Sequence, residues 1–285
     1  MKTTNISHQA ENTPPQAIIL TGPSSCGKGS VAEALCATFN IPHEHWLSMG
    51  AILRSTFERA PRDAAFAGLL ADKYAISNHV ELLTSPDATP ELTAMVEEHA
   101  DGVGKMLAEK TSRAIEGSAW QSVSQLEWLE YCTSHGLLNP DRWTQCLIAA
   151  HIETIPDVSR QNLIIDGYPR TVGAARHLLE VFEENGVNRI RVLHMRIAKD
   201  EMMSRAAGRG RLDDTRAALE RRYRFYEEEV VPCIAHLEGV LGANAVAVIN
   251  AHQPHFDETP DGQKFNLEKS IANVVASAFK ALDPA

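Results

Sequence analysis

The sequence lacks the usual features of membrane, secreted and nucleic-acid-binding proteins. No apolar run approaches the roughly 18 residues of a transmembrane helix, and residues 1–16 lack the apolar stretch of a secretory signal. The five cysteines include no C-x-x-C pair, which argues against a disulfide framework or a four-cysteine zinc site and favours the reducing cytoplasm. Lysine and arginine number 27 against 37 acidic residues, a formal net charge of −10. Nucleic-acid binding and attachment to a membrane by a basic face are therefore not expected.

What the sequence does contain is an alternation of apolar runs and amphipathic stretches. Its 285 residues, 44% of them hydrophobic, suffice for one or two domains with a sizeable core. The expected buried strands are 17–20, 163–165, 190–197 and 245–249, and the expected helices 30–39, 143–155, 174–184, 214–240 and 267–282. This order predicts an α/β fold of three layers with a central parallel sheet, after a flexible segment at 1–16.

Residues 55–135 break this alternation. No strand is expected there, and the spacing of apolar residues indicates several helices, so we interpret the stretch as a helical insertion in the α/β core. An apolar stripe on one of its helices comprises Trp120, Val123, Trp128 and Tyr131. Core packing is the expected role of this stripe. A wall for a ligand's base, or a dimer contact, is the alternative.

Directly after the first expected strand lies a glycine-rich loop of the pattern G-x4-G-K-x-S. Its residues are Gly22, Pro23, Ser24, Ser25, Cys26, Gly27, Lys28, Gly29 and Ser30. Glycines let the backbone curl so that its N–H groups point at phosphate oxygens, and the following helix adds partial positive charge. The pattern therefore predicts a P-loop, in which Lys28 reaches the β- and γ-phosphates and Ser30 holds Mg²⁺. A glycine-rich turn without function is the alternative.

A second motif, Asp166-Gly167-Tyr168-Pro169-Arg170, follows the expected strand at 163–165. Because ligands of open α/β sheets bind at the carboxyl ends of the strands, Asp166 could orient Mg²⁺-bound water there. The planar guanidinium of Arg170 suits bidentate contact with a phosphate. The Asp-Gly pair also predicts a turn, which is compatible with this role.

A third feature is a concentration of positive charge. Seven of the 18 arginines lie between residues 205 and 224, where there is no lysine: Arg205, Arg209, Arg211, Arg216, Arg221, Arg222 and Arg224. Such a cluster is usually a solvated helix face. In an acidic chain with a P-loop, the use of arginine without lysine indicates that these residues bind phosphates and stabilise the charge that develops during phosphoryl transfer.

Together these motifs resemble the adenylate kinase family of nucleoside monophosphate kinases. The family's D-G-[FY]-P-R hallmark resembles Asp166 to Arg170, and its G-K-G-T resembles residues 27–30. Further likenesses extend over most of 17–280. Residues 48–54 resemble the family's acceptor segment S-T-G-D-L-L-R, and residues 136–141 resemble its G-x-L-V-x-D element. The arginines of 205–222 have the spacing of short-lid members, and residues 249–251 resemble the strand near the adenine of ATP.

The resemblance implies a P-loop NTPase fold and a role for each matching position. The ATP-binding residues would be Gly22, Ser25, Cys26, Gly27, Lys28, Gly29, Ser30 and Arg205, the last near the base. The acceptor-binding residues would be Met49, Gly50, Arg54, Gly167, Arg170, Ala174, Arg211 and Arg222. The catalytic groups would be Lys28, Arg170, Arg205, Arg211 and Arg222, with Mg²⁺ held by Ser30 and, through water, by Asp166.

The chain also departs from that family. Members that use AMP read its adenine with a Thr and a Gln, and the matching positions here are Met49 and Ala174, which offer almost no hydrogen-bonding capacity. The interval of 82 residues from Arg54 to Gly136 is far longer than the family's short connection. No cysteines lie in the expected lid, so no zinc is expected there. His43, His45, His252 and His255 have no ligand partners at metal spacing and are interpreted as surface or packing residues.

We therefore expect a cytoplasmic phosphotransferase that uses ATP and Mg²⁺ to phosphorylate a nucleoside monophosphate. The expected core covers 17–54, 136–204 and 215–285, with the insertion at 55–135 and a short lid at 205–214. Its partners would be small nucleotides rather than nucleic acid or membranes, and it would be a monomer or a homodimer. The alternatives are a kinase of another small acceptor and a nucleotide-binding interaction protein without catalysis.

Overall fold

The computed structural model divides the chain into two compact units. Its described residues are 17–111, 119–137, 139–209, 215–260 and 262–282. One unit, the sheet unit, comprises Met1–Met49 and Ile155–Ala285, and the other, the helical unit, comprises Gly50–Thr154. The lead-in at 1–16 and the lid positions 210–214, which include Arg211, lie outside the described residues.

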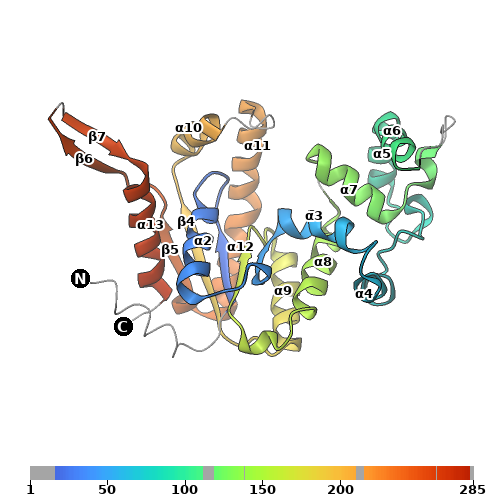
Figure 1. Ribbon diagram of the computed structural model, residues 1–285, viewed down its shortest axis with the longest axis horizontal. Helices are drawn as coiled ribbons and strands as arrows, with labels where there is room; N and C mark the ends of the chain where they lie inside the picture. Colours follow the sequence, from blue (N-terminus) through green and yellow to red (C-terminus); the bar gives the residue numbers. More distant parts are fainter. Residues whose placement is uncertain (1–16, 112–118, 138, 210–214, 261, 283–285) are drawn as a thin grey trace. The chain divides into compact units, whose positions relative to one another are not determined.

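A parallel sheet of five strands forms the centre of the sheet unit. The strands are β1 (Ala17–Thr21), β2 (Trp46–Ser48), β3 (Leu163–Asp166), β4 (Ile190–Arg196) and β5 (Val246–Asn250), in the spatial order β2-β3-β1-β4-β5. Every residue of the central strand β1 is buried, as expected for a strand with a neighbour on each side and helices over both faces. The predicted α/β class and parallel sheet are confirmed (Figure 1).

Helices cover the sheet of this unit on both sides (Figure 1). α2 (Lys28–Phe39) and α13 (Leu267–Leu282) pack against each other, as do α9 (Val172–Glu184) and α12 (Val231–Leu241). α10 (Lys199–Arg209) and α11 (Arg216–Phe225) also contact each other. Leu20, Leu35 and Leu193 are fully buried within this core, and burial of each such side chain stabilises the fold by about 1.5–3 kcal/mol.

Three elements of this unit differ from the sequence prediction. β2 was not expected, because three residues are too few to show a strand pattern. The single helix expected at 214–240 is divided by a π-helical turn, Tyr226–Val230, just before Pro232, which has no N–H to continue the regular ladder. The antiparallel pair β6 (His255–Thr259) and β7 (Gly262–Asn266) was also missed, since its phenylalanines, Phe256 and Phe265, are exposed and give no buried face.

The helical unit is built from six helices among its described residues. They are α3 (Met49–Arg59, whose first residue belongs to the sheet unit), α4 (Ala64–Tyr74), α5 (Pro90–Glu98), α6 (Ala100–Thr111), α7 (Gln125–His135) and α8 (Asp141–Glu153). In the described part of 55–135 the only β pairing is one isolated bridge, Glu81 with Ser124, as expected for a helical stretch. The apolar stripe was expected on one helix, but only Trp128 and Tyr131 lie on α7, while Val123 precedes it and Trp120 lies in a 3-10 turn. Val123, Trp128 and Tyr131 are buried, which is the packing role expected for them.

The described residues contain neither a disulfide nor a helix that could span a membrane. All five cysteines are free thiols, so the structure contains no disulfide. No described helix combines the length and the apolar character that crossing a membrane requires.

Candidate active site

The glycine-rich loop connects β1 to α2, as the motif predicts. Gly22 has φ +140°, and a Cβ on it would lie 2.3 Å from the carbonyl oxygen of Met195, so only glycine fits there. Gly27 has φ +94° and precedes α2, where no side chain caps the helix. The first-turn N–H groups of a helix lack intrahelical acceptors and carry partial positive charge. The start of α2 is therefore suited to hold an anion.

Lys28 is folded back over this loop. Its Nζ donates hydrogen bonds to the carbonyl oxygens of Gly22, at 3.0 Å, and Pro23, at 2.9 Å, and lies 3.5 Å from the sulfur of Cys26. The hydroxyl of Ser25 is buried and finds no hydrogen-bond partner in the described chain. A buried hydroxyl without a partner is costly, and a phosphate oxygen at the loop would supply an acceptor for it.

Asp166 is the last residue of β3 and lies opposite Leu20 of β1 and Ser48 of β2. Burial raises the pKa of its carboxyl group, and the positive charge of Lys28 opposes that shift. The indole N–H of Trp46 also lowers this pKa, although it forms no hydrogen bond of standard geometry. A buried carboxylate of this kind is stabilised by additional positive charge, such as a metal ion bound nearby.

Arg170 lies beside Asp166, at the end of the second motif. Gly167, at φ +73°, donates its N–H to the carbonyl oxygen of Leu20 at 3.1 Å, and its own carbonyl accepts from Arg170 Nε at 2.7 Å. The side chain of Arg170 reaches solvent, yet neighbouring protein lowers its pKa by displacing water. Asp166 raises that pKa and Arg222 lowers it, so both lie within electrostatic range of the Arg170 guanidinium.

The expected arginine group is only partly described. Arg222 is half-buried on α11, and Arg205 is half-buried on α10, where its Nε donates to Glu201 at 2.7 Å. Arg211 lies outside the described residues. The sheet unit thus brings Lys28, Asp166, Arg170 and Arg222 into one electrostatic neighbourhood at the carboxyl ends of β1 and β3.

The remaining acceptor positions divide between the two units. In the sheet unit, Met49 and Ala174 are 8% and 4% exposed, and neither side chain offers a base a strong hydrogen-bonding group. In the helical unit, Arg54 is exposed on α3, and a Cβ on Gly50 would lie 3.5 Å from Arg54 Nη1. The expected roles of Met49, Ala174, Gly50 and Arg54 remain predictions.

Sequence reasoning missed a buried pair near the loop. His194 Nε2 of β4 lies 2.7 Å from the hydroxyl of Tyr226, and burial lowers the pKa of His194 to about 4. The pair lines a cavity of about 400 Å³ with Arg196, Ile197, Tyr223 and Glu227. A polar residue inside the apolar run 190–197 was the available signal.

Two oxygen donors of the site fit a Mg²⁺ ion that nucleotide phosphates also bind. The described chain contains no cluster of three His, Cys, Asp or Glu side chains that could hold a metal ion alone. Mg²⁺ commonly takes one or two protein oxygens and completes its shell with phosphates and water. The half-buried Ser30, in the first turn of α2, and Asp166 are oxygen donors of that kind, so the residues present fit the ion.

The chain is similar to curated adenylate kinases. No family model matches the chain. It is 33% identical to an adenylate kinase of Mycobacterium sp. (strain MCS) and 35% identical to one of Mycobacteroides abscessus, in each case over 106 residues, 37% of this chain and 58% of the relative. It is 26% identical to an adenylate kinase of Mycolicibacterium smegmatis over 82% of this chain and 92% of that protein. The chain therefore spans little more than half of the first two relatives, and most of the third at lower identity.

Proposed function

We propose that the chain is a member of the adenylate kinase family, to whose curated members it is similar, and that it transfers the γ-phosphoryl group of ATP to a nucleoside monophosphate. The observation that carries the proposal is the juxtaposition of Lys28, Asp166 and Arg170 at the carboxyl ends of β1 and β3. Lys28 and Arg170 carry positive charge that suits phosphates, Asp166 suits a metal ion bound with them, and together they flank the loop that begins α2.

In this proposal the chain positions two nucleotides and stabilises negative charge. The loop amides and Lys28 bind the β- and γ-phosphates of ATP, for which Lys28 exchanges its carbonyl contacts for phosphate oxygens. Arg170 and Arg54 bind the acceptor monophosphate. Arg205, Arg211 and Arg222 neutralise the charge on the transferring group. Ser30 and, through water, Asp166 would hold Mg²⁺, which would supply positive charge to the phosphates.

The transfer needs no nucleophile from the protein. An oxygen of the acceptor monophosphate bonds to the γ-phosphorus while the bond from that phosphorus to the β–γ bridging oxygen breaks, which leaves ADP and a nucleoside diphosphate. Catalysis then consists of alignment and electrostatic stabilisation, both of which depend on water being excluded.

An acceptor other than AMP is favoured by one observation. Met49 and Ala174, which match the base-reading positions of AMP-using members, are buried and apolar in side chain. Within the proposal this favours another nucleoside monophosphate, and a kinase of a different small phosphorylated acceptor is the second candidate. The cysteines, all free thiols, suit the cytoplasmic location we propose, and we retain a monomer or homodimer that acts on small nucleotides.

A coupled assay of ADP formation tests the proposal. ATP and Mg²⁺ are supplied with AMP, CMP, UMP, GMP or a deoxynucleoside monophosphate in turn. We expect at least one monophosphate to raise turnover well above the rate with ATP alone. Equal rates with and without every monophosphate would exclude nucleoside monophosphate kinase activity and leave the second candidate to be tested with other phosphorylated acceptors.

A further inference from the structure

The part of the sheet unit next to β4 and β5 has the geometry of a donor-base subsite. The P-loop follows β1, and the next strands on one side are β4 and β5. The N–H of Ala251, just past β5, donates to the carbonyl oxygen of Arg196 at 2.8 Å, so the chain after β5 stays close to the end of β4. Asp166 ends β3 and the acceptor-side Arg170 follows it, on the other side of β1. ATP bound at the P-loop would therefore extend its base over β4 and β5.

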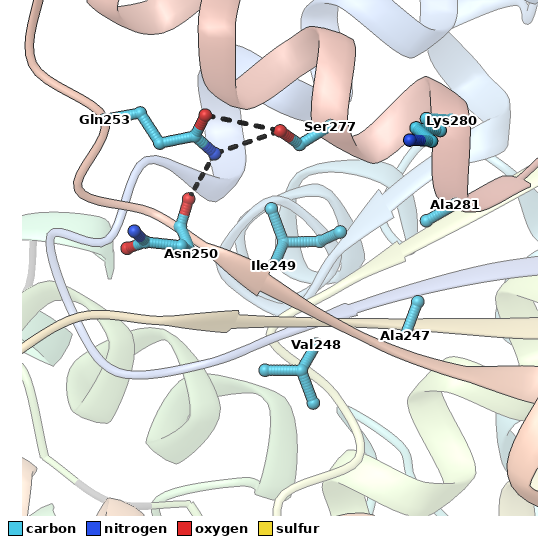
Figure 2. A pocket seen from close by; sticks show the side chains of 8 residues that line it. All are labelled: Ala247, Val248, Ile249, Asn250, Gln253, Ser277, Lys280 and Ala281. Atoms are coloured by element: carbon cyan, nitrogen blue, oxygen red, sulfur yellow. Dashed lines mark hydrogen bonds between the residues drawn. The ribbon is translucent and has the colours of Figure 1, made fainter.

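The loop at 250–253 is fixed from α13. Gln253 Nε2 donates to the carbonyl oxygen of Asn250 at 2.7 Å and to the hydroxyl of Ser277 at 3.0 Å (Figure 2). The N–H of His252 donates to Asn250 Oδ1 at 2.9 Å. These bonds form the rim of a groove of about 600 Å³ between β5 and α13, and they set the position from which the His252 side chain extends.

His252 meets two charged residues of α10. Glu201 Oε1 accepts a hydrogen bond from Arg205 Nε at 2.7 Å and lies 3.1 Å from His252 Nδ1. The same His252 Nδ1 lies 3.4 Å from Arg205 Nη2. The pKa of Glu201 is lowered by the hydrogen bond from Arg205 and further by His252. The three side chains thus form a triangle, which we call the Arg205 cluster.

This cluster has two hydrogen-bonding states with nearly the same atomic positions. When His252 Nδ1 carries a lone pair, it accepts from Arg205 Nη2, so the guanidinium bridges His252 and Glu201. When both ring nitrogens are protonated, Nδ1 donates to Glu201 Oε1, and the imidazolium repels Arg205. In the described chain the charged groups recorded against His252 are Glu201 and Arg205, while the loop and α13 offer neutral Asn250, Gln253, Asn273 and Ser277.

We propose that His252 is a pH-sensitive positioning residue for ATP, acting through Arg205 and together with Glu201. This inference rests on the proposed function, in which Arg205 lies near the ATP base. With the Nε2–H tautomer of neutral His252, the guanidinium plane is held at two points and offers the base a fixed surface on which to stack. Protonation of His252 removes one of these points, so ATP binds more weakly as the pH falls.

Direct measurement of ATP binding tests this role without relying on turnover. Isothermal titration with ATP and Mg²⁺ is done at pH 8.0 and pH 5.5 on the wild type, His252→Gln, Glu201→Gln and His255→Gln. His255 is the matched control, because it is a half-exposed histidine that pairs instead with Asp257, at 3.4 Å. The phosphates of ATP also titrate in this range. We therefore take, for each protein, the ratio of its dissociation constants at the two pH values, and compare that ratio between variants.

We expect the ratio of the ATP dissociation constant at pH 5.5 to that at pH 8.0 to be roughly threefold larger in the wild type and in His255→Gln than in His252→Gln. The reason is that protonation costs the first two proteins one hydrogen bond of the Arg205 cluster. Glu201→Gln should weaken ATP binding at both pH values without raising the KM of the acceptor. The same pH ratio in wild type and His252→Gln would overturn this inference while leaving phosphoryl transfer standing. ATP that binds with this pH ratio but is never transferred would overturn the proposed function alone. A wild type that does not bind ATP at all would overturn both.

Discussion

In the helical unit Asp87 accepts four hydrogen bonds, whereas in the sheet unit Ser25 has a buried hydroxyl without a partner among the described residues. Asp87 binds Arg142 through two bonds of 2.6 and 2.8 Å and accepts from Trp143 and Gln125 at 2.9 Å each. Lys28 donates only to backbone carbonyls and a thiol in the contacts recorded for it. The pKa of Asp166 is raised by burial, and that of Asp87 is lowered. The Asp87 network satisfies its polar groups internally, although Trp128 Nε1 and Asn139 Oδ1 of the same unit are buried without a partner among the described residues. The loop of the sheet unit leaves the buried Ser25 hydroxyl to a ligand.

The largest effect should come from Lys28→Ala. We expect phosphoryl transfer to fall by at least about 100-fold, because a positive charge that stabilises the transferring phosphates is lost. The unfolding midpoint should change little, since the bonds that Lys28 makes with its own loop are few and partly solvated. Initial rates and thermal unfolding measure the two effects. Unchanged activity would contradict the assignment of the loop of the sheet unit to phosphate binding.

Asp87→Ala should have the opposite profile. Loss of the carboxylate leaves Arg142, Trp143 and Gln125 without their common acceptor, and we expect the helical unit to lose about 2–3 kcal/mol. Burial raises the pKa of Asp87, but hydrogen bonds from Arg142 and Trp143 outweigh it and lower the pKa overall. The contribution of Asp87 to stability is therefore present above pH 3.8, the ordinary pKa of aspartate, and disappears as the pH falls through the lower pKa of the folded state.

Urea unfolding followed by tryptophan fluorescence measures the loss, since Trp120, Trp128 and Trp143 all belong to the helical unit. Asp101→Ala is the matched control, an exposed acid on α6, and should shift stability by less than about 0.5 kcal/mol. Equal effects of the two substitutions would contradict the internal role of Asp87.

His151 predicts a loss of stability in acid. Thr56 donates its hydroxyl proton to Ile52 at 2.8 Å, so its oxygen accepts from His151 Nε2 at 3.2 Å. Burial lowers the pKa of His151 from 6.5 to about 4, with a smaller effect from Arg59. Unfolded chains therefore take up the proton first, and stability falls as the pH drops from 6.5 towards 4.

Between pH 7 and pH 5 the wild type should lose about 2 kcal/mol more than His151→Gln, whose amide retains a hydrogen-bond donor. The difference between the two proteins is measured by urea unfolding at both pH values. Taking this difference cancels the contribution of His194, which is present in both proteins and has a similarly low pKa in the sheet unit. Parallel losses in the two proteins would show that His151 is not the group responsible.

The smallest effect is expected for Lys73→Met. Lys73 Nζ lies 2.6 Å from Glu153 Oε1, but half of the lysine side chain is exposed, and Tyr74 also donates to the same oxygen at 2.7 Å. An exposed ion pair contributes less than about 1 kcal/mol. We expect a shift of that size in urea unfolding and no change in phosphoryl transfer. A loss as large as that of Asp87→Ala would mean that exposed charges also hold this unit together.

Local patterns allowed much of the sheet unit to be predicted from sequence. The loop from Gly22 to Ser30 is contiguous, and so is the motif ending at Arg170, so their conformation follows from adjacent residues. Four strands and their helices were expected because buried apolar runs are visible along the chain. β2 is three residues long, and β6 and β7 bury no apolar face, so neither leaves such a pattern.

Contacts between distant residues could not be predicted. Asp87 and Arg142 are 55 positions apart, and Gln125 lies between them, so their network depends on how the helices pack. His252 was interpreted as a surface or packing residue, yet it contacts Glu201 and Arg205, 51 and 47 positions before it. The sequence placed His252 just after a strand, but only the fold brings α10 next to it.

The most direct test of the central claim follows the γ-phosphate of ATP itself. ATP labelled in the γ-phosphate is incubated with the protein, Mg²⁺ and each monophosphate, and the products are separated. We predict that label appears in a nucleoside diphosphate, and that Lys28→Ala abolishes this product while Lys73→Met retains it. Label found only in inorganic phosphate, or remaining in ATP with every monophosphate, would contradict the assignment of the sheet unit to phosphoryl transfer between nucleotides.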